Sequence, residues 1–285
     1  DNVYDVIVEV TDGTFTDSQA ISVTVNDSVE SDSILISTDQ NVTSSGAPGL
    51  SAWDAGEVIE FGSITSLDPV AGTTSGSFAS LFNLTSFAQD GAADIESLHY
   101  VTEDITIGNT TTYGLQAGDV LFATRDIETL ISTNTLAVTR NDLIVFRPDA
   151  AGDYSSGTFT ILLKNPVSLG FHAVTLITQD TVVGDVTLSK GSFLLAHTDS
   201  LQHHKIQYYT PDNVGAISTT GTLQTLIDET SILSGQLQGL DLIETSVTLG
   251  GHTLNVGEIL VSVKGGGTVG SNNVVVTGND IFSIS

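Results

Sequence analysis

The sequence predicts an all-β fold built from repeated four-stranded antiparallel meanders. Short apolar segments of four to eight residues, alternating or continuous, are separated by turns rich in Gly, Asp and Asn. Segments of the same type recur in the same order along the chain. No segment has a convincing amphipathic helical period. Together these observations predict strands and turns throughout.

Composition limits the class of protein. The chain has 285 residues, of which 40 % are apolar, enough for one large β domain and a smaller piece. It has 34 acidic and 7 basic residues, so its net charge is −27. We therefore expect no binding to nucleic acid and no insertion into membranes, because such a surface repels phosphate groups. The acidity suits Ca²⁺, but it also serves solubility alone.

The absence of Cys excludes disulfides, thiolate zinc sites and a thiol nucleophile. Acidic, Cys-free chains rich in Thr, Gly and Val are common among large secreted bacterial proteins, so we expect an extracellular or cell-surface location. The apolar runs are too short to span a bilayer. The chain starts at Asp1 without an initiator Met, and we expect a processed or cropped chain.

Residues 1–30 predict a β-hairpin. The segments YDVIVEV at 4–10 and SQAISVTV at 18–25 alternate strictly and are joined by Asp12-Gly13. This ending, closed by Val25-Asn26-Asp27, resembles the last two strands of a bacterial cadherin-like or immunoglobulin-like repeat. The resemblance implies the end of a β-sandwich, with Asp12, Asn26 and Asp27 near inter-domain Ca²⁺ positions. The alternative is that these are turn and linker residues.

The polar segment SVESDS at 28–33 marks a boundary, after which residues 31–285 predict a repeat domain. Its units start near 34, 120, 193 and 259, with the apolar strands ILIST, VLFAT, FLLAHT and ILVSV. Second strands begin at Glu57, Asp142, Lys205 and Asp280, and third strands follow Gly/Thr/Ser turns at 75, 156 and 220. Fourth strands are expected at 94, 171 and 239.

Radial stacking of four-stranded meanders makes a β-propeller, in which a sheet buries both faces. Near-continuous apolar first strands fit its innermost position; tandem β-sandwich modules are the alternative. Three full units and half of a fourth cannot close a propeller. Either the chain is a piece of a longer protein, which we favour, or the two N-terminal strands complete the fourth sheet.

The repeat unit resembles the loosely patterned blades of bacterial extracellular propellers. Three features are shared, as in Leu115–Leu163. A Gly and a polar residue precede the first strand, a later strand ends in the motif Phe/Tyr-x-Pro, and a Gly-Thr-Phe segment begins the strand after it. The resemblance implies a propeller of a secreted or surface protein. Arg125 and Arg147 have no basic counterpart in most other units, so they are candidates for a function specific to this one.

Two groups of residues are candidate metal ligands. Glu57, Asp142 and Asp280 enter equivalent strands, so a ring around a propeller axis could hold Ca²⁺. The alternative is that each carboxylate caps a turn, and Lys205 breaks the ring. His197, with His203 or His204 across a hairpin and Asp199, could bind a transition metal; the alternative is a solvated loop.

Trp53 and Asp54 are a candidate sugar-binding pair, because an exposed indole stacks on sugars; the alternative is that Trp53 pins its loop to the core. We find no nucleophile elbow, paired-carboxylate motif or phosphate loop in the sequence. We therefore expect that the protein is not an enzyme.

The leading hypothesis is a non-enzymatic structural or adhesion module of a large bacterial surface or secreted protein. Its partners would be other domains of the same protein, neighbouring copies, or surface glycans and proteins. The alternatives are a carbohydrate- or peptide-binding propeller and, further, a propeller hydrolase or lyase. No cofactor other than Ca²⁺ is expected.

Overall fold

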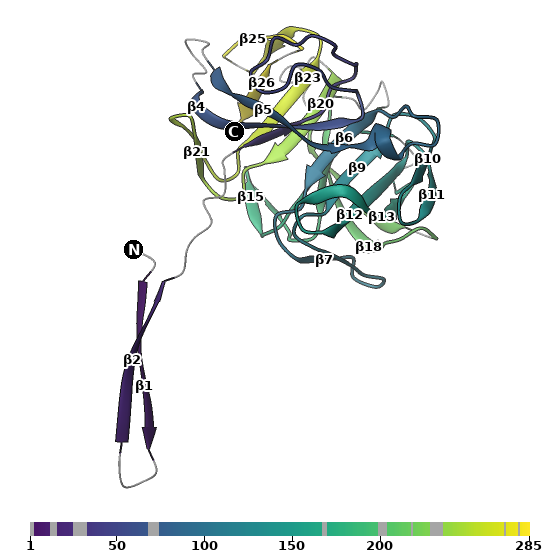
Figure 1. The fold of residues 1–285 in the computed structure, drawn as a ribbon. Helices are drawn as coiled ribbons and strands as arrows, with labels where there is room; N and C mark the ends of the chain where they lie inside the picture. The colour runs from purple at the N-terminus through teal and green to yellow at the C-terminus, as the bar shows by residue number, and fades with distance from the viewer. Residues whose placement is uncertain are drawn as a thin grey trace. The chain divides into compact units, whose positions relative to one another are not determined.

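A computed structural model gives the structure of the chain (Figure 1). It describes the backbone of 3–11 and 16–24, and the residues 33–67, 74–166, 170–198, 204–217, 219–228, 236–270, 272–278 and 280–285. Contacts between Cα atoms divide the chain into two units, residues 1–31 and 32–285. The division falls beside the predicted domain boundary.

In the first unit, β1 (Val3–Thr11) and β2 (Thr16–Thr24) pair antiparallel in a two-stranded sheet. Val6 lies opposite Ile21 and Val8 opposite Gln19. The predicted pair of N-terminal strands is therefore confirmed. The turn at Asp12 and the closing residues Asn26 and Asp27 lie outside the described residues.

Among the described residues of the second unit, four antiparallel sheets have three or four strands and are numbered here in chain order. Sheet 1 is β3 (Ile34–Ile36), β4 (Glu57–Leu67) and β5 (Thr74–Asn83). Sheet 2 is β6 (Ile95–Tyr100), β9 (Val120–Thr124), β12 (Asp142–Ala150) and β13 (Asp153–Lys164). Sheet 3 is β14 (Phe171–Leu176), β17 (Phe193–His197), β18 (Ile206–Asn213) and β19 (Thr220–Ile227). Sheet 4 is β20 (Gln236–Leu242), β23 (Ile259–Lys264) and β26 (Ile281–Ile284).

These strands confirm the predicted all-β fold, but the predicted grouping into units is wrong by one strand. Each expected fourth strand pairs with the first strand of the following unit, as β6 does with β9, β14 with β17, and β20 with β23. The apolar strands β9 and β17 are therefore second in their sheets rather than innermost. Strands β6, β14 and β20 are edge strands of sheets 2, 3 and 4. They contact one another and are called the innermost strands below.

Small hairpins fill the connections between the sheet strands. They are β7–β8 (Ile105–Ile107, Tyr113–Leu115), β10–β11 (Glu128–Ile131, Thr135–Val138), β15–β16 (Thr181–Val183, Val186–Leu188), β21–β22 (Val247–Leu249, His252–Leu254) and β24–β25 (Gly267–Val269, Val274–Val276). The last residue of each hairpin is a buried Leu or Val. Between β5 and β6 lies one turn of 3₁₀ helix, η1 (Leu84–Phe87).

One type of turn precedes six of the sheet strands. In each, the backbone N–H of the fourth residue donates to the carbonyl of the first, at Glu57, Asp119, Asp142, Ser192, Glu258 and Asp280. In four of the turns the carboxylate of the fourth residue also accepts the N–H of the first, as Asp142 does from Thr139 at 2.9 Å. The Gly-polar and Asp-before-strand motifs of the sequence are thus the same structural element.

Four hydrophobic clusters lie between the sheets. One joins sheets 1 and 2, another sheets 2 and 3, another sheets 3 and 4. A smaller cluster joins residues of sheet 4 and the β21–β22 hairpin to Ile34, Ile64 and Leu67 of sheet 1. In β9, Val120 and Phe122 enter the first cluster while Leu121 and Ala123 enter the second, so both faces of the strand are buried.

Two of these turns, at Asp142 and Asp280, allow a matched pair of substitutions to be compared. Asp142 and Asp280 accept the same hydrogen bonds from a Thr three residues earlier, but Asp142 is fully buried and also pairs with Lys164, whereas Asp280 is exposed. We expect Asp142→Ala to lower the free energy of unfolding by about 2–4 kcal/mol, because Thr139 and Lys164 lose the buried carboxylate with which they interact. Asp280→Ala should cost about 1 kcal/mol or less. Urea unfolding measures both, and equal losses would contradict the role given to burial.

Candidate functional site

The innermost strands β6, β14 and β20 carry a β-bulge at the same place. The pairing register skips one residue between Ile95 and Ser97, between Phe171 and Ala173, and between Leu237 and Gly239. A bulge leaves the extra residue unpaired and redirects its side chain. The residues in the three bulges are Glu96, His172 and Gln238.

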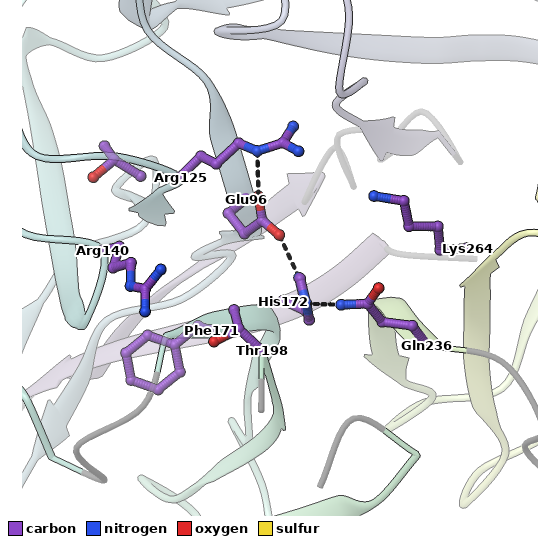
Figure 2. Close-up of a pocket in the computed structure, with 9 residues that line it drawn as sticks. Glu96, Arg125, Arg140, Phe171, His172, Thr198, Gln236 and Lys264 are labelled. Atoms are coloured by element: carbon purple, nitrogen blue, oxygen red, sulfur yellow. Dashed lines mark hydrogen bonds and ion pairs between the residues drawn. The ribbon is translucent and has the colours of Figure 1, made fainter. Parts of the chain in front are cut away.

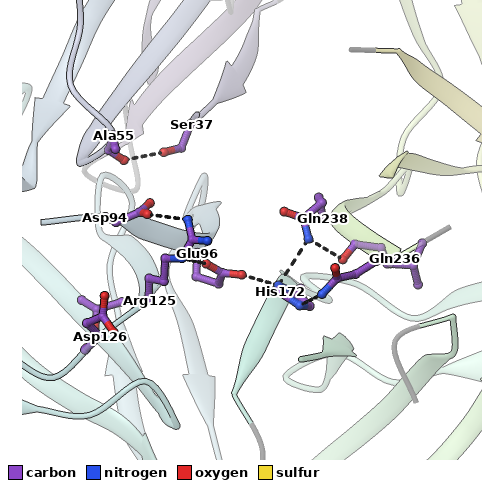
Figure 3. Close-up of polar contacts among 11 residues, drawn as sticks. Ser37, Ala55, Asp94, Glu96, Arg125, Asp126, His172, Gln236 and Gln238 are labelled. Carbon is purple, nitrogen blue, oxygen red and sulfur yellow. Dashed lines mark hydrogen bonds and ion pairs between the residues drawn. The ribbon is translucent and has the colours of Figure 1, made fainter. Parts of the chain in front are cut away.

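The bulged residues form the first polar layer (Figure 3). His172 Nδ1 contacts Glu96 Oε1, and Gln238 Nε2 lies 3.4 Å from the same ring nitrogen. Gln236 Nε2 contacts His172 Nε2. The imidazole of His172 thus has a polar partner at each ring nitrogen. Side chains from sheets 2, 3 and 4 therefore meet directly.

An arginine extends this layer outward. Arg125 Nη1 lies 3.0 Å from Asp94 Oδ2, and its Nε lies 3.9 Å from Glu96 Oε2. Burial raises the pKa of Asp94, although the hydrogen bond from Arg125 opposes that shift. The same hydrogen bond raises the pKa of Arg125, which stays a cation. The charges thus run in sequence from Asp94 through Arg125 to Glu96.

A second polar layer comes three residues later on the same strands. Thr175 Oγ1 lies 3.2 Å from His99 Nδ1 and donates to Asp241 Oδ1 at 3.0 Å. Burial lowers the pKa of His99 to about 4 and raises that of Asp241 to about 6. At neutral pH, His99 is therefore neutral and Asp241 ionised, and Thr175 takes a hydrogen bond from the imidazole while giving its own to the carboxylate.

A pocket of about 250 Å³ opens at the first layer (Figure 2). Its lining combines residues from all three inner strands or their neighbours: Glu96, Thr124, Arg125, Arg140, Phe171, His172, Thr198, Gln236 and Lys264. Arg125, Thr198 and Lys264 occupy equivalent places, each at the C-terminal end of the second strand of its sheet, or one residue beyond it. The pocket is thus a feature of the repeat, assembled where equivalent strand ends meet.

Two of the predicted transition-metal ligands, His197 and His204, have other polar partners in the structure. His197 is buried and its Nε2 contacts Gln207 Oε1 on the neighbouring strand. His204 Nε2 lies 3.4 Å from Asp228 Oδ1, and His203 and Asp199 lie outside the described residues. Over the described part of the chain, no group of three or more His, Asp or Glu side chains could hold a metal ion.

The predicted acidic ring shows a different arrangement. Asp142 and Asp280 each accept the N–H and hydroxyl of a Thr in their own turn, and Glu57 accepts the N–H of Asp54 at 3.1 Å. These contacts are those of the alternative, a carboxylate that caps a turn. Because the three lie in separate turns, Ca²⁺ binding by them stays a prediction without a shared site in the described residues.

Trp53 is half-buried and holds its loop to the sheet. Its Nε1 donates to Thr38 Oγ1 at 3.0 Å, and its ring stacks on Phe78 with centroids 6.5 Å apart. Asp54 Oδ2 lies 3.5 Å from Asn83 Nδ2. Sugar binding by Trp53 and Asp54 stays a prediction, and the contacts match the alternative of a pinned loop. Arg147, the other singled-out cation, clamps Asp119 with two hydrogen bonds of 2.9 and 2.6 Å.

Sequence reasoning missed the residues of the two polar layers, although the sequence contains a signal for them. Glu96, His172 and Gln238 are separated by 76 and 66 residues, and so are His99, Thr175 and Asp241. These polar residues recur in strands that were compared only for their apolar positions. Aligning the polar positions as well would have shown both layers.

The second layer predicts opposing effects of pH. The raised pKa of Asp241 gives stability that is complete below its unfolded value of 3.8 and is lost as the pH rises through about 6. The lowered pKa of His99 gives stability that is complete above 6.5 and is lost as the pH falls through about 4. Between these limits the two effects offset each other.

We therefore expect Asp241→Asn to lose about 1–3 kcal/mol more stability than the wild type when the pH falls from 6.5 to 4, and His99→Gln to lose less than the wild type by a similar amount. Urea unfolding at several pH values measures the slopes, which do not depend on the variants' overall stability. His252→Gln, on a surface hairpin, is the control. If the unfolding free energy of both variants changed with pH as that of the wild type does, the pKa shifts assigned to Asp241 and His99 would be contradicted.

No helix in the described residues is long and apolar enough to cross a membrane. Comparison of the chain with protein-family models, with curated proteins and with solved structures finds no match. The resemblances drawn from the sequence therefore stay predictions, and function has to be inferred from the polar layers and the pocket.

Proposed function

We propose that residues 32–285 are a propeller-like, non-enzymatic binding module of a bacterial extracellular adhesion protein. The four sheets supply the blades, and β6, β14 and β20 are the strands nearest the axis. The clusters between successive sheets, and between sheet 4 and sheet 1, support this arrangement. Tandem sandwiches fit less well, because each sheet of a sandwich buries only one face.

The binding role is inferred from the side chains that lie where the innermost strands meet. A purely structural repeat would fill the meeting point of its inner strands with apolar side chains. Here Glu96, His172 and Gln238 meet instead, beside a pocket of about 250 Å³. Small-molecule sites are concave and hold convergent polar groups, and this pocket has both properties, with Phe171 as the one apolar residue of its lining.

The polar geometry favours binding over catalysis. In a nucleophilic triad the imidazole lies between the hydroxyl and the carboxylate. Here the order is different, because the hydroxyl of Thr175 lies between the imidazole of His99 and the carboxylate of Asp241. The carboxylate therefore does not orient the imidazole as a base for that hydroxyl. The hydrolase alternative therefore gains no support from these three residues.

The proposed partners are surface glycans or proteins, other domains of the same protein, and neighbouring copies. A net charge of −27 disfavours nucleic acid. Ca²⁺ stays part of the proposal through Asp12, Asn26 and Asp27, which lie outside the described residues. If the ion is bound in the folded state only, chelation with EGTA should lower the melting temperature by about 5 °C or more, and an unchanged melting temperature would remove Ca²⁺ from the proposal.

A steric variant tests the binding role. We expect the immobilised chain to retain at least one member of a panel of bacterial and host surface polysaccharides. Thr198→Tyr should abolish that retention, because Thr198 lines the pocket and a phenol ring would fill it. Thr187→Tyr, on the exposed surface of β16, is the matched control and should bind as the wild type does. Retention that survives Thr198→Tyr would place the site elsewhere, and no retention by the wild type would leave a structural module.

A further inference from the structure

The pocket gathers cations in a chain that has few of them. Of the seven Lys and Arg residues, three line it, namely Arg125, Arg140 and Lys264. Each of the other four makes an ion pair with a carboxylate away from the pocket: Arg147 with Asp119, Lys164 with Asp142, Lys190 with Glu103, and Lys205 with Asp228. Positive side chains are therefore concentrated at this pocket, whereas each of the others lies beside its own carboxylate.

The charges inside the pocket are not balanced. Its one carboxylate, Glu96, is engaged by His172 and faces Arg125 at 3.9 Å. Arg140 and Lys264 pair with no carboxylate among the described residues. Figure 2 shows these two side chains on either side of the Glu96–His172 contact. With 34 acidic residues in the chain, such cations could easily have been given a partner.

We propose that this pocket binds an oxyanion group, a carboxylate, sulfate or phosphate, carried on a ligand of about one sugar ring. The inference rests on the proposed binding function and names its ligand class. The guanidinium of Arg140 presents a planar fork of donors, and Lys264 adds a mobile ammonium group, which together suit an oxyanion.

The acidity of the whole chain does not oppose this assignment. Interactions between exposed charges are largely screened beyond about 8 Å at physiological ionic strength. An anion inside the pocket therefore experiences Arg140 and Lys264 more strongly than the carboxylates that lie far from the pocket, while Arg125 offsets the nearby Glu96 and Asp94. The volume of about 250 Å³ lies just below that of pockets for drug-sized ligands, so a single ring with one charged group is an appropriate size.

Titration calorimetry of the full chain at fixed ionic strength tests the proposal with four probes on the same ring: glucose, glucuronate, glucose 6-sulfate and glucose 6-phosphate. We expect at least one of the three anions to bind about tenfold or more tightly than glucose. The comparison among the three identifies the oxyanion. In the double variant Arg140→Gln/Lys264→Gln, whose side chains are exposed and make no ion pair with described residues, the Kd of that anion should rise about tenfold or more.

Lys190→Gln, which removes a cation outside the pocket, is the matched control and should leave the Kd unchanged. The proposal is overturned if no anion binds better than glucose, or if the double variant binds the anion as the wild type does. A wild-type chain that retains a neutral polysaccharide, loses it with Thr198→Tyr and keeps it with the double variant would preserve the binding function and reject the oxyanion.

Discussion

Burial of the central sheets on both faces is the constraint on which the rest of the structure depends. In β9 and β12, successive apolar side chains enter opposite clusters, and in β17 Phe193 and Leu195 point one way and Leu194 and Ala196 the other. Strands of this kind have no face left for polar groups. Chemistry is therefore confined to the strand ends, the turns between strands and the innermost strands.

The innermost strands then have to satisfy polar groups away from water, which is costly unless partners are supplied. They do so across sheets, because the bulges align one residue from each strand. Glu96 finds His172, and Thr175 joins His99 to Asp241. The opposite pKa shifts of His99 and Asp241 are the residual cost of this burial, since neither contact supplies a full countercharge.

The sequence was sufficient to predict the strands of the four larger sheets, the order in which they recur, and the turn role of Asp142 as one of two alternatives, but not the small hairpins between them. Period and turn chemistry are local, so residues close in sequence carry that information. The sheet boundaries were misplaced because apolar content was taken as the mark of an innermost strand. In fact β17 is buried by sheets packed on both its faces, while the innermost β14 carries His172 and Thr175. The pocket could not be predicted from the sequence, since Arg140 and Lys264 come to line one pocket only through the arrangement of three sheets.

The distribution of the seven cations follows from the same constraint. Two of the turn carboxylates, Asp119 and Asp142, are almost completely buried, and each has a cation, Arg147 or Lys164. An unpaired charge at those positions would cost several kcal/mol, roughly 3–5 for a broken buried pair. Exposed Asp280 needs none, because water solvates it. No such demand explains Arg140 and Lys264, which are exposed and have no acid to neutralise among the described residues. Stability accounts for the buried pairs, so the charges at the pocket are better explained by a ligand than by the fold.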